Sequence, residues 1–525
     1  MRFSLITTPW LPVRYRDGST GKVAPVQITD PSIVDINAPR PDFQGAAWQF
    51  LIGLLQTACA PEDKEEWEAL WHKGLDHEAL QAALMPLDFA FQFGEQTPAF
   101  MQDYEALDGE QVGIAALLPE APGSQALKFN KDHFVKRDTV KAMCPHCAAL
   151  ALFSLQTNAP AGGKGYRTSL RGGGPMTTLL TLASASPATE ASLWQKLWLN
   201  VIPQEYGFGR PEKITAALFP WLGPTRTSEK ASGVTTPEQV DKLQAYWGMP
   251  RRIRLNFSDL NRGECSLCGE FSDALLSTMT VKNYGTNYVQ WQHPLTPHRR
   301  PLKEGGELFS VKGQPGGLFW RDWLGLNWQT ASDSNNEYPA FVVKQYHAHP
   351  ITSVQKAIGL WGFGYDFDNM KARCWYEHRF PLLQLDAAQR ERHIECLQQA
   401  AKSASRTLNL LRGALKEAWS NDAKNSRGDY SFIDVDFWQL TRPLFDDFRR
   451  ELAEQVENDA LIPCWQAQLW RFARNYFDQH VFTNPYDQVD YAQIMQARKK
   501  YFTASAEKQR ARTKKSSVKQ EANHE

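Results

Sequence analysis

Four of the eight cysteines form two Cys-x-x-Cys pairs, Cys144/Cys147 and Cys265/Cys268. Each such turn presents two sulfurs on one side, and four thiolates suit tetrahedral zinc. The gap between the pairs is too long for a compact zinc ribbon, so a shared site would fasten two distant segments together. With four sulfur ligands and no open position, the role of that zinc would be structural. Two unrelated buried pairs, or a redox pair, are the alternatives.

The stretch after the first pair, NAPAGGKGYRTSLRGGGP (158–175), combines glycine clusters with Lys164, Arg167 and Arg171. Glycine lets the backbone approach another molecule closely. Successive backbone N–H groups can cradle phosphates, and the cations would add charge. The stretch is not a Walker A motif, because GGKGY lacks the Ser or Thr after lysine and the glycine five residues before it. A connecting loop with ordinary turns is the alternative.

Two further stretches mix charged and aromatic residues. KFNKDHFVKRDTVK (128–141) sets five Lys and Arg residues around Phe129 and Phe134, the mixture that nucleic-acid loops use. GYDFDNMKARCWYEH (364–378) places Asp368, Asn369 and Lys371 between aromatic flanks, where a tight turn is expected. A solvated basic face and an ordinary hairpin tip are the alternatives.

The composition limits the class of protein. The 525 residues suffice for two to four domains, and the 42% of hydrophobic residues suffice for real cores. The formal net charge is zero, so any binding of nucleic acid must come from local basic patches. The beginning does not read as a signal peptide, no apolar run is long enough to span a membrane, and the cysteines do not resemble a secreted disulfide framework. We therefore expect a cytoplasmic protein, and no enzyme, because HExxH and GxSxG motifs are lacking.

Periodicity predicts the elements that must position these residues. Alternation over 2–14, followed by the turn RDGSTGK, predicts a hairpin with 23–28. We expect helices at 43–55, 62–74, 76–85 and 147–156, a loop at 160–175, a strand at 177–183 and short strands over 279–345.

The C-terminal part has a helical period. Apolar residues recur at alternating steps of three and four from Ile394 to Leu415, as in the seam of a helix bundle. Apolar spacing predicts further helices at 437–452, 462–481 and 491–501. The polar end, residues 506–525, lacks aromatic residues, so it should be disordered, with cations that could touch phosphate.

Several of these motifs together resemble one family. LPVR near the start, APAGGKGYRTSLRGGGPMTTLL (159–180), the ordered Cys-x-x-Cys pairs and the final helices are similar to the large subunit of the type I-E CRISPR Cascade complex, the CasA family. The resemblance covers most of residues 1–500. It implies an α+β fold, with a mixed α/β DNA-recognition domain (1–380), a C-terminal four-helix bundle (381–505) and the disordered tail (506–525).

The resemblance also implies a function. Members of this family have no catalytic site, contact guide RNA and other Cascade subunits, and recognise the protospacer-adjacent motif in target double-stranded DNA. They help to open the duplex and recruit a helicase-nuclease, and some bind zinc. By match to the family, the residues that contact DNA are Phe134, Val135 and Lys136 in a loop, Ala161, Gly162, Gly163, Lys164 and Gly165 in a glycine loop, Lys282, and Asp368, Asn369, Met370 and Lys371 in a wedge hairpin.

Two other functions fit the same residues. One is a zinc-containing enzyme that acts on nucleic acid, and the other is a scaffold whose bundle only holds partners. Turnover of nucleic acid by the metal-loaded protein would favour the first. Target binding that survives charge reversal at Lys164, Lys282 and Lys371 would favour the second.

Overall fold

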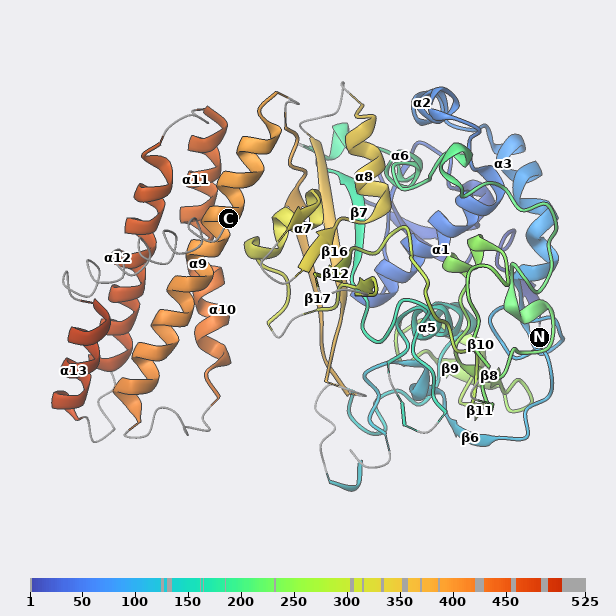
Figure 1. Ribbon diagram of the computed structural model, residues 1–525. Coiled ribbons are helices and arrows are strands. Elements are labelled where there is room, and N and C mark those ends of the chain that lie inside the picture. Colours follow the sequence, from blue (N-terminus) through green and yellow to red (C-terminus); the bar gives the residue numbers. More distant parts are fainter. Residues whose placement is uncertain are drawn as a thin grey trace. The chain divides into compact units, whose positions relative to one another are not determined.

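The protein is described here by a computed structural model (Figure 1). The structure describes residues 2–123, 127–129, 135–160, 162–163, 165–184, 186–230, 233–302, 306–313, 316–331, 335–351, 357–368, 371–385, 388–420, 429–454, 459–482 and 490–502. The chain divides into two compact units, one formed by 1–318 with 325–384 and the other by 319–324 with 385–525. The first unit mixes helices and strands and the second is helical, which confirms the α+β class.

Two buried helices form the centre of the first unit. Helix α1 (Pro41–Cys59) and helix α5 (Pro145–Asn158) each begin with a proline, which has no N–H to leave unpaired at a helix start. Both are buried on nearly every face, so the single apolar face predicted for 43–55 understates the burial of α1. The buried helix predicted at 147–156 is confirmed.

Shorter helices complete this unit, and α7 (Trp323–Asn327) is shared between the two units. Asp63 and Asp76 cap α2 and α3 by accepting hydrogen bonds from Glu66 N (2.9 Å) and Ala79 N (2.6 Å). Gly74, with a φ of 75°, follows the end of α2. The bounds are Lys64–Lys73 for α2, His77–Leu84 for α3, Leu193–Trp198 for α6, Trp323–Asn327 for α7 and Phe341–Ala348 for α8.

The strands of the described residues form small antiparallel sheets rather than one large sheet. The sheet orders are β3–β2–β4 (Thr20–Val23, Leu11–Tyr15, Ile33–Ile36), β1–β5 (Arg2–Ser4, Gln92–Gly94), β6–β11–β8 (Glu110–Gly113, Thr278–Lys282, Arg252–Leu255), β9–β10 (Asn261–Glu264, Phe271–Leu275), β13–β12–β15–β14 (Phe309–Ser310, His298–Pro301, Asn335–Tyr338, Thr330–Ala331) and β7–β16–β17 (Thr177–Leu182, Ile358–Asp368, Lys371–Pro381).

The predicted N-terminal strand is divided in two. Strand β2 forms the expected hairpin with β3, with Leu11 opposite Val23. Residues 2–4, however, form β1 and pair with β5 instead. The Ser4 hydroxyl accepts hydrogen bonds from Ile6 N and Thr7 N, each 3.0 Å, and this local turn ends β1.

The core is packed with aromatic rings, which accounts for much of the high tryptophan content. The Phe50 ring lies edge-on to five others at centroid distances of 5.5 to 6.0 Å; these are Trp10, Phe91, Phe100, Phe153 and Trp247. Edge-to-face pairs are favoured over face-to-face stacks by the ring quadrupoles. This cluster joins α1 to α5 and so makes a rigid base for the loop that follows α5.

The second unit is a helical bundle. Its helices are α9 (Arg390–Trp419), α10 (Ser431–Leu440), α11 (Arg442–Glu454), α12 (Leu461–Phe482) and α13 (Tyr491–Phe502) (Figure 1). The predicted seam is confirmed at Leu397, Ala404, Leu408, Leu411 and Leu415, which are buried, whereas Ile394 and Ala401 are only partly buried. Trp465 Nε1 of α12 donates to Ala400 O of α9 over 3.0 Å, which fixes the two helices against each other.

The single helix predicted over 437–452 is broken at Thr441. Pro443 follows, and a proline cannot donate the hydrogen bond that would continue the helix. The Thr441 hydroxyl accepts from Trp320 Nε1 over 3.1 Å, and the Trp320 ring stacks on Phe445 at 4.3 Å. The segment 319–324 therefore belongs to the bundle. The division into 1–380, 381–505 and 506–525 stays a prediction, and the tail lies outside the described residues.

None of the described helices combines the length and the apolarity needed to cross a lipid bilayer.

Candidate metal centre and nucleic-acid interface

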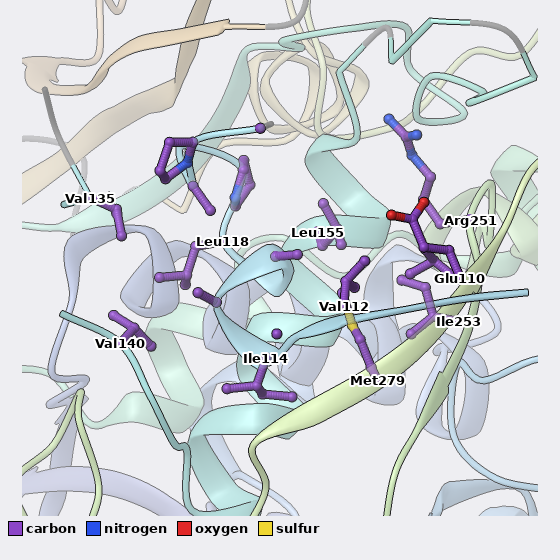
Figure 2. A pocket seen from close by; sticks show the side chains of 18 of the residues that line it. Glu110, Val112, Ile114, Leu118, Val135, Val140, Leu155, Arg251, Ile253 and Met279 are labelled. Atoms are coloured by element: carbon purple, nitrogen blue, oxygen red, sulfur yellow. The ribbon is translucent and has the colours of Figure 1, made fainter. Parts of the chain in front are cut away.

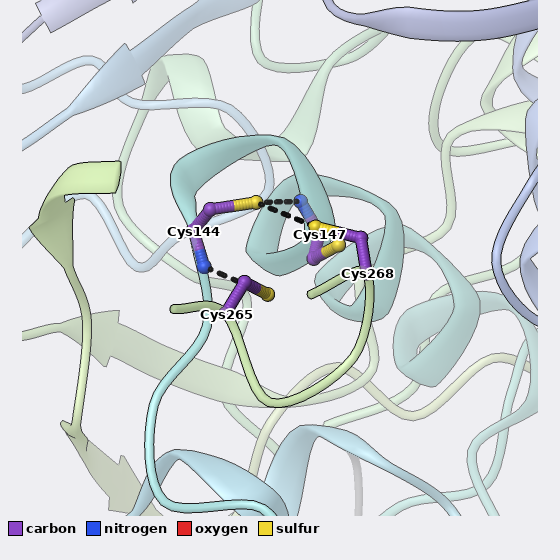
Figure 3. A group of neighbouring side chains, drawn as sticks. All are labelled: Cys144, Cys147, Cys265 and Cys268. Carbon is purple, nitrogen blue, oxygen red and sulfur yellow. Dashed lines mark hydrogen bonds between the residues drawn. The ribbon is translucent and has the colours of Figure 1, made fainter. Parts of the chain in front are cut away.

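The two Cys-x-x-Cys pairs come together at one point (Figure 3). The four sulfur atoms of Cys144, Cys147, Cys265 and Cys268 lie within 4.8 Å of one another, and the first three residues are buried. The Sγ atoms of Cys144 and Cys268 are 3.8 Å apart, and none of these cysteines is in a disulfide. Tetrahedral zinc with Zn–S bonds of about 2.3 Å requires sulfurs about 3.8 Å apart. The cluster therefore fits such an ion.

Local backbone geometry aims the sulfurs inward. Cys144 is the N-cap of α5, and its Sγ accepts a hydrogen bond from Cys147 N over 3.4 Å. On the other side, the turn between β9 and β10 is closed by Gly269 N donating to Cys265 O over 2.9 Å. Gly269 has a φ of 73°, which a glycine adopts without strain. Cys144 N also donates to Cys265 Sγ over 3.3 Å, so the two turns contact each other directly.

The thiols differ in acidity. Hydrogen bonds from Cys144 and Cys147 lower the pKa of Cys265, because they stabilise its thiolate. Hydrogen bonds with Cys144 and Cys265, together with burial, raise the pKa of Cys147. A metal cation bound by the four sulfurs would stabilise the thiolate form of each. The arrangement can hold a metal with sulfur at every position.

The glycine stretch leaves the end of α5 and packs against the end of β11. Gly165 O accepts a hydrogen bond from Tyr284 N over 2.7 Å. Gly163 and Gly165 have φ values of 76° and 81°, and a Cβ on Gly165 would lie 3.0 Å from Asn283 Cβ. A Cβ on Gly162 would lie 2.5 Å from Tyr166 Cβ. These glycines are required by close approach within the protein, and they bring the loop beside Lys282, the last residue of β11.

Three predicted DNA-contacting residues line one cavity of about 740 Å³ (Figure 2). They are Val135, Lys136 and Lys282, and Tyr166 of the glycine stretch lines it too. Apolar side chains such as Ile114 surround this space, while Lys136 is exposed and Lys282 is partly exposed. The structure therefore brings together the loop before the first cysteine pair, the glycine loop and the end of β11.

The far end of the glycine stretch contacts the predicted wedge hairpin, β16–β17. Gly174 has a φ of 71°, and a Cβ there would lie 2.9 Å from Phe367 Cδ2 and 3.0 Å from Tyr365 O. Asp368 and Lys371 form the last described pair of the ladder before the tip, and both are exposed. The described residues that line the cavity do not include them. The glycine stretch thus connects the cavity to the part of the hairpin that lies next to its tip.

The two arginines of the glycine stretch are engaged within the protein, Arg171 buried and Arg167 partly buried, which corrects the expectation that they could contact phosphate. Arg171 is 5% exposed, and it donates to Thr177 Oγ1 over 2.9 Å and to Gln49 Oε1 over 2.5 Å. Burial lowers the pKa of Arg171 to about 9. Arg167 is held by Ser228, with Nε 2.7 Å from its hydroxyl oxygen. Both arginines hold the loop in place.

The basic cluster RRIR at 251–254 is also largely internal. Arg251 lies over the Tyr166 ring, with its Cζ 5.0 Å from the centroid, and it lines the cavity. Arg252 is 7% exposed and pairs with the buried Asp103 over 2.6 Å. The sequence did not reveal these contacts. The alternation in RRIRL puts Arg252 on the face opposite Ile253 and Leu255, so the sequence carried no signal that Arg252 is buried.

Several predicted site residues cannot be placed. Phe134, Ala161, Lys164, Asn369 and Met370 lie outside the described residues. Their roles, like those of the other predicted DNA-contacting residues, stay predictions.

Comparison with known proteins gives consistent matches. A family model described as CRISPR-associated protein Cse1 (CRISPR_cse1) matches residues 4–476. CasA of Thermus thermophilus is 18% identical, with a TM-score of 0.63 over 95% of this chain and 98% of that one. Cse1 of Thermobifida fusca is 17% identical, with a TM-score of 0.65 over 95% and 96%. A chain of a CRISPR RNA-guided surveillance complex is 15% identical, with a TM-score of 0.69 over 96% and 100%. At these identities the likeness shows a shared fold.

Proposed function

Because this chain belongs to the CRISPR-associated Cse1 family, that of the Cascade large subunit CasA, we propose that it is the non-catalytic large subunit of an RNA-guided surveillance complex. In this role it binds guide RNA and the other subunits. It reads the protospacer-adjacent motif in double-stranded target DNA, helps to open the duplex and then recruits a helicase-nuclease.

The observation that carries the proposal is the path of the glycine stretch. One end lies beside Lys282 and the cavity lined by Val135 and Lys136, and the other end supports the β16–β17 hairpin. One continuous segment therefore connects the residues proposed to read the motif with the hairpin proposed to part the strands. Reading and opening occur at adjacent base pairs, so such a connection suits this function.

The charge distribution supports weak scanning rather than tight binding. The net charge is zero, Arg171 and Arg252 are buried, and partly buried Arg167 is bound to Ser228. Within the proposed interface, Lys136 and Lys371 are exposed and Lys282 is partly exposed, so these lysines are the ones proposed to contact phosphates. A protein that neutralises few phosphates binds non-specific DNA weakly and leaves sequence recognition to the guide.

The cysteine cluster lies at the start of α5, the helix that leads into the glycine stretch. We propose that it holds a structural zinc ion, because four sulfurs would occupy all four positions of a tetrahedral ion and leave none for a substrate or an activated water. The ion would fix the start of α5, and α5 leads directly into the glycine stretch. This favours a structural subunit over the alternative of a zinc enzyme.

The test is target binding by the complete complex, reconstituted with guide RNA. Lys164→Glu, Lys282→Glu and Lys371→Glu are introduced singly and together, and Lys213→Glu, an exposed lysine elsewhere in the same unit, is the control. Each true phosphate contact removed should lower affinity for motif-containing duplex and reduce the slope of log affinity against log salt by about one. Unchanged affinity and slope in the triple variant would assign the role of a scaffold instead.

A further inference from the structure

The β16–β17 hairpin contains one extra residue just before its tip. Asp366 is opposite Cys374, but Phe367 is opposite Ala372, so Arg373 is the extra residue of a β-bulge. A bulge bends its strand, increases the local twist and re-aims what lies beyond it. Beyond this one lie Asp368 and Lys371. The direction in which Asp368 and Lys371 continue the ladder is therefore set at Arg373.

A bidentate ion pair closes across the bulge. Arg373 Nε donates to Asp366 Oδ2 over 2.9 Å, and Nη2 donates to Oδ1 over 2.7 Å. The Asp366 side chain is 3% exposed, whereas that of Arg373 is 44% exposed. Two parallel hydrogen bonds fix the orientation of the guanidinium as well as its distance. The pair thus joins the bulged residue to the strand opposite and holds the bend at one angle.

A second anchor lies one residue further from the tip. The Tyr365 hydroxyl is 2.7 Å from Asp42 Oδ2 and 3.0 Å from Glu120 Oε2. Arg40 pairs with both carboxylates, so the hydroxyl joins a largely buried group of one guanidinium and two carboxylates. Asp42 belongs to α1, and Glu120 lies in a segment whose neighbours Pro119 and Ala121 line the cavity. The hairpin is thereby tied to the core and to the cavity wall.

We propose that Asp366, Arg373 and Tyr365 are positioning residues that fix the direction of the hairpin tip for duplex opening. The inference rests on the function proposed above and adds to it the residues that aim the wedge. A wedge separates two stacked base pairs only while the protein behind it holds it rigidly in place. Without the ion pair the bend is free to vary, so fewer complexes hold the tip between base pairs, while contacts made by the glycine loop and Lys282 persist.

The experiment compares two targets with the assembled, guide-loaded complex. One target is fully paired, and the other carries two mismatched base pairs beside the motif, so that it is already open there. Strand opening is followed by stopped-flow fluorescence of 2-aminopurine placed in the first base pairs. The variants are Arg373→Ala, Arg373→Lys and Tyr365→Phe, with Glu377→Ala, an exposed residue of the same strand, as the control. Lys371→Glu reports on the tip itself.

We expect Arg373→Ala to slow the opening of the paired target by about tenfold or more, because small misplacements of acting groups have effects of this size. The mismatched target should restore the rate to within about twofold of the native complex. Arg373→Lys should be intermediate, because lysine keeps the charge but not the paired hydrogen bonds. Glu377→Ala should match the native complex on both targets.

Three other outcomes would contradict either the positioning role or the wedge function itself. If Arg373→Ala is slow on both targets, the residue supports general stability and the positioning proposal is wrong. If Lys371→Glu is slow on the paired target but Arg373→Ala and Tyr365→Phe are not, the proposal is wrong while the wedge function stands. If Lys371→Glu also opens the paired target at the native rate, the wedge function itself fails.

Discussion

Removal of one sulfur from the cysteine cluster should destabilise the mixed α/β unit by a predictable amount. Cys147 and Cys265 enclose a loop of about 120 residues, and a cross-link that closes such a loop restricts the unfolded chain by about 5 kcal/mol. The unit has about 380 residues, so its unfolding entropy is about 0.8 kcal/mol per degree. Replacement of Cys265 by serine, which breaks the link, should therefore lower the melting temperature of this unit by about 6 °C.

Differential scanning calorimetry of the purified full chain measures this shift, and elemental analysis measures bound metal. We expect about one zinc per chain in the native protein and in Cys374→Ser, which changes an exposed cysteine outside the cluster. A strong chelator should reproduce the shift in the native protein and have little effect on Cys265→Ser. Protein that contains no stoichiometric metal, or a Cys265→Ser variant that melts like Cys374→Ser, would refute this reasoning.

Three further predictions concern residues that hold the fold. Burial and the charge of Arg171 lower the pKa of His298 to about 4 from 6.5, so between these pH values the unfolded chain binds a proton that the folded chain does not. The free energy of unfolding should therefore decrease by up to about 3 kcal/mol as pH falls through this window. In urea titrations at several pH values, His298→Gln should weaken this dependence on pH. Asp103→Ala leaves Arg252 buried without its partner and should cost about 3 to 5 kcal/mol by chemical denaturation. Leu411→Ala, in the buried seam of α9, should cost about 2 to 5 kcal/mol and lower only the melting transition of the bundle.

Local signals in the sequence predicted the local structure well. The helices predicted at 62–74 and 76–85 agree with α2 and α3 to within two residues, and most of the apolar steps from 394 to 415 lie in the buried seam of α9. The four cysteines were predicted to meet because two turns of the same type present sulfurs in the same way. Each of these features depends on residues that are close in sequence or on one shared chemistry.

Features that depend on distant partners were not predictable in this way. The burial of Arg171 is set by Gln49 and Thr296, which are more than a hundred residues away in the chain. The bulge at Arg373 depends on how two long strands align, and a one-residue change of register has no local signature. The same holds for Trp320, which packs in the bundle although the chain on either side of the short segment 319–324 belongs to the other unit.

The most direct test of the central claim is a photocrosslinking experiment on the assembled complex. A photoreactive amino acid is placed at position 371, beside the hairpin tip, and at position 213 as a control on another surface. With a bound target duplex, position 371 should crosslink to the first base pairs next to the motif, where the strands separate, and position 213 should not. Crosslinks from position 371 only to other subunits, or to DNA far from that point, would contradict the account.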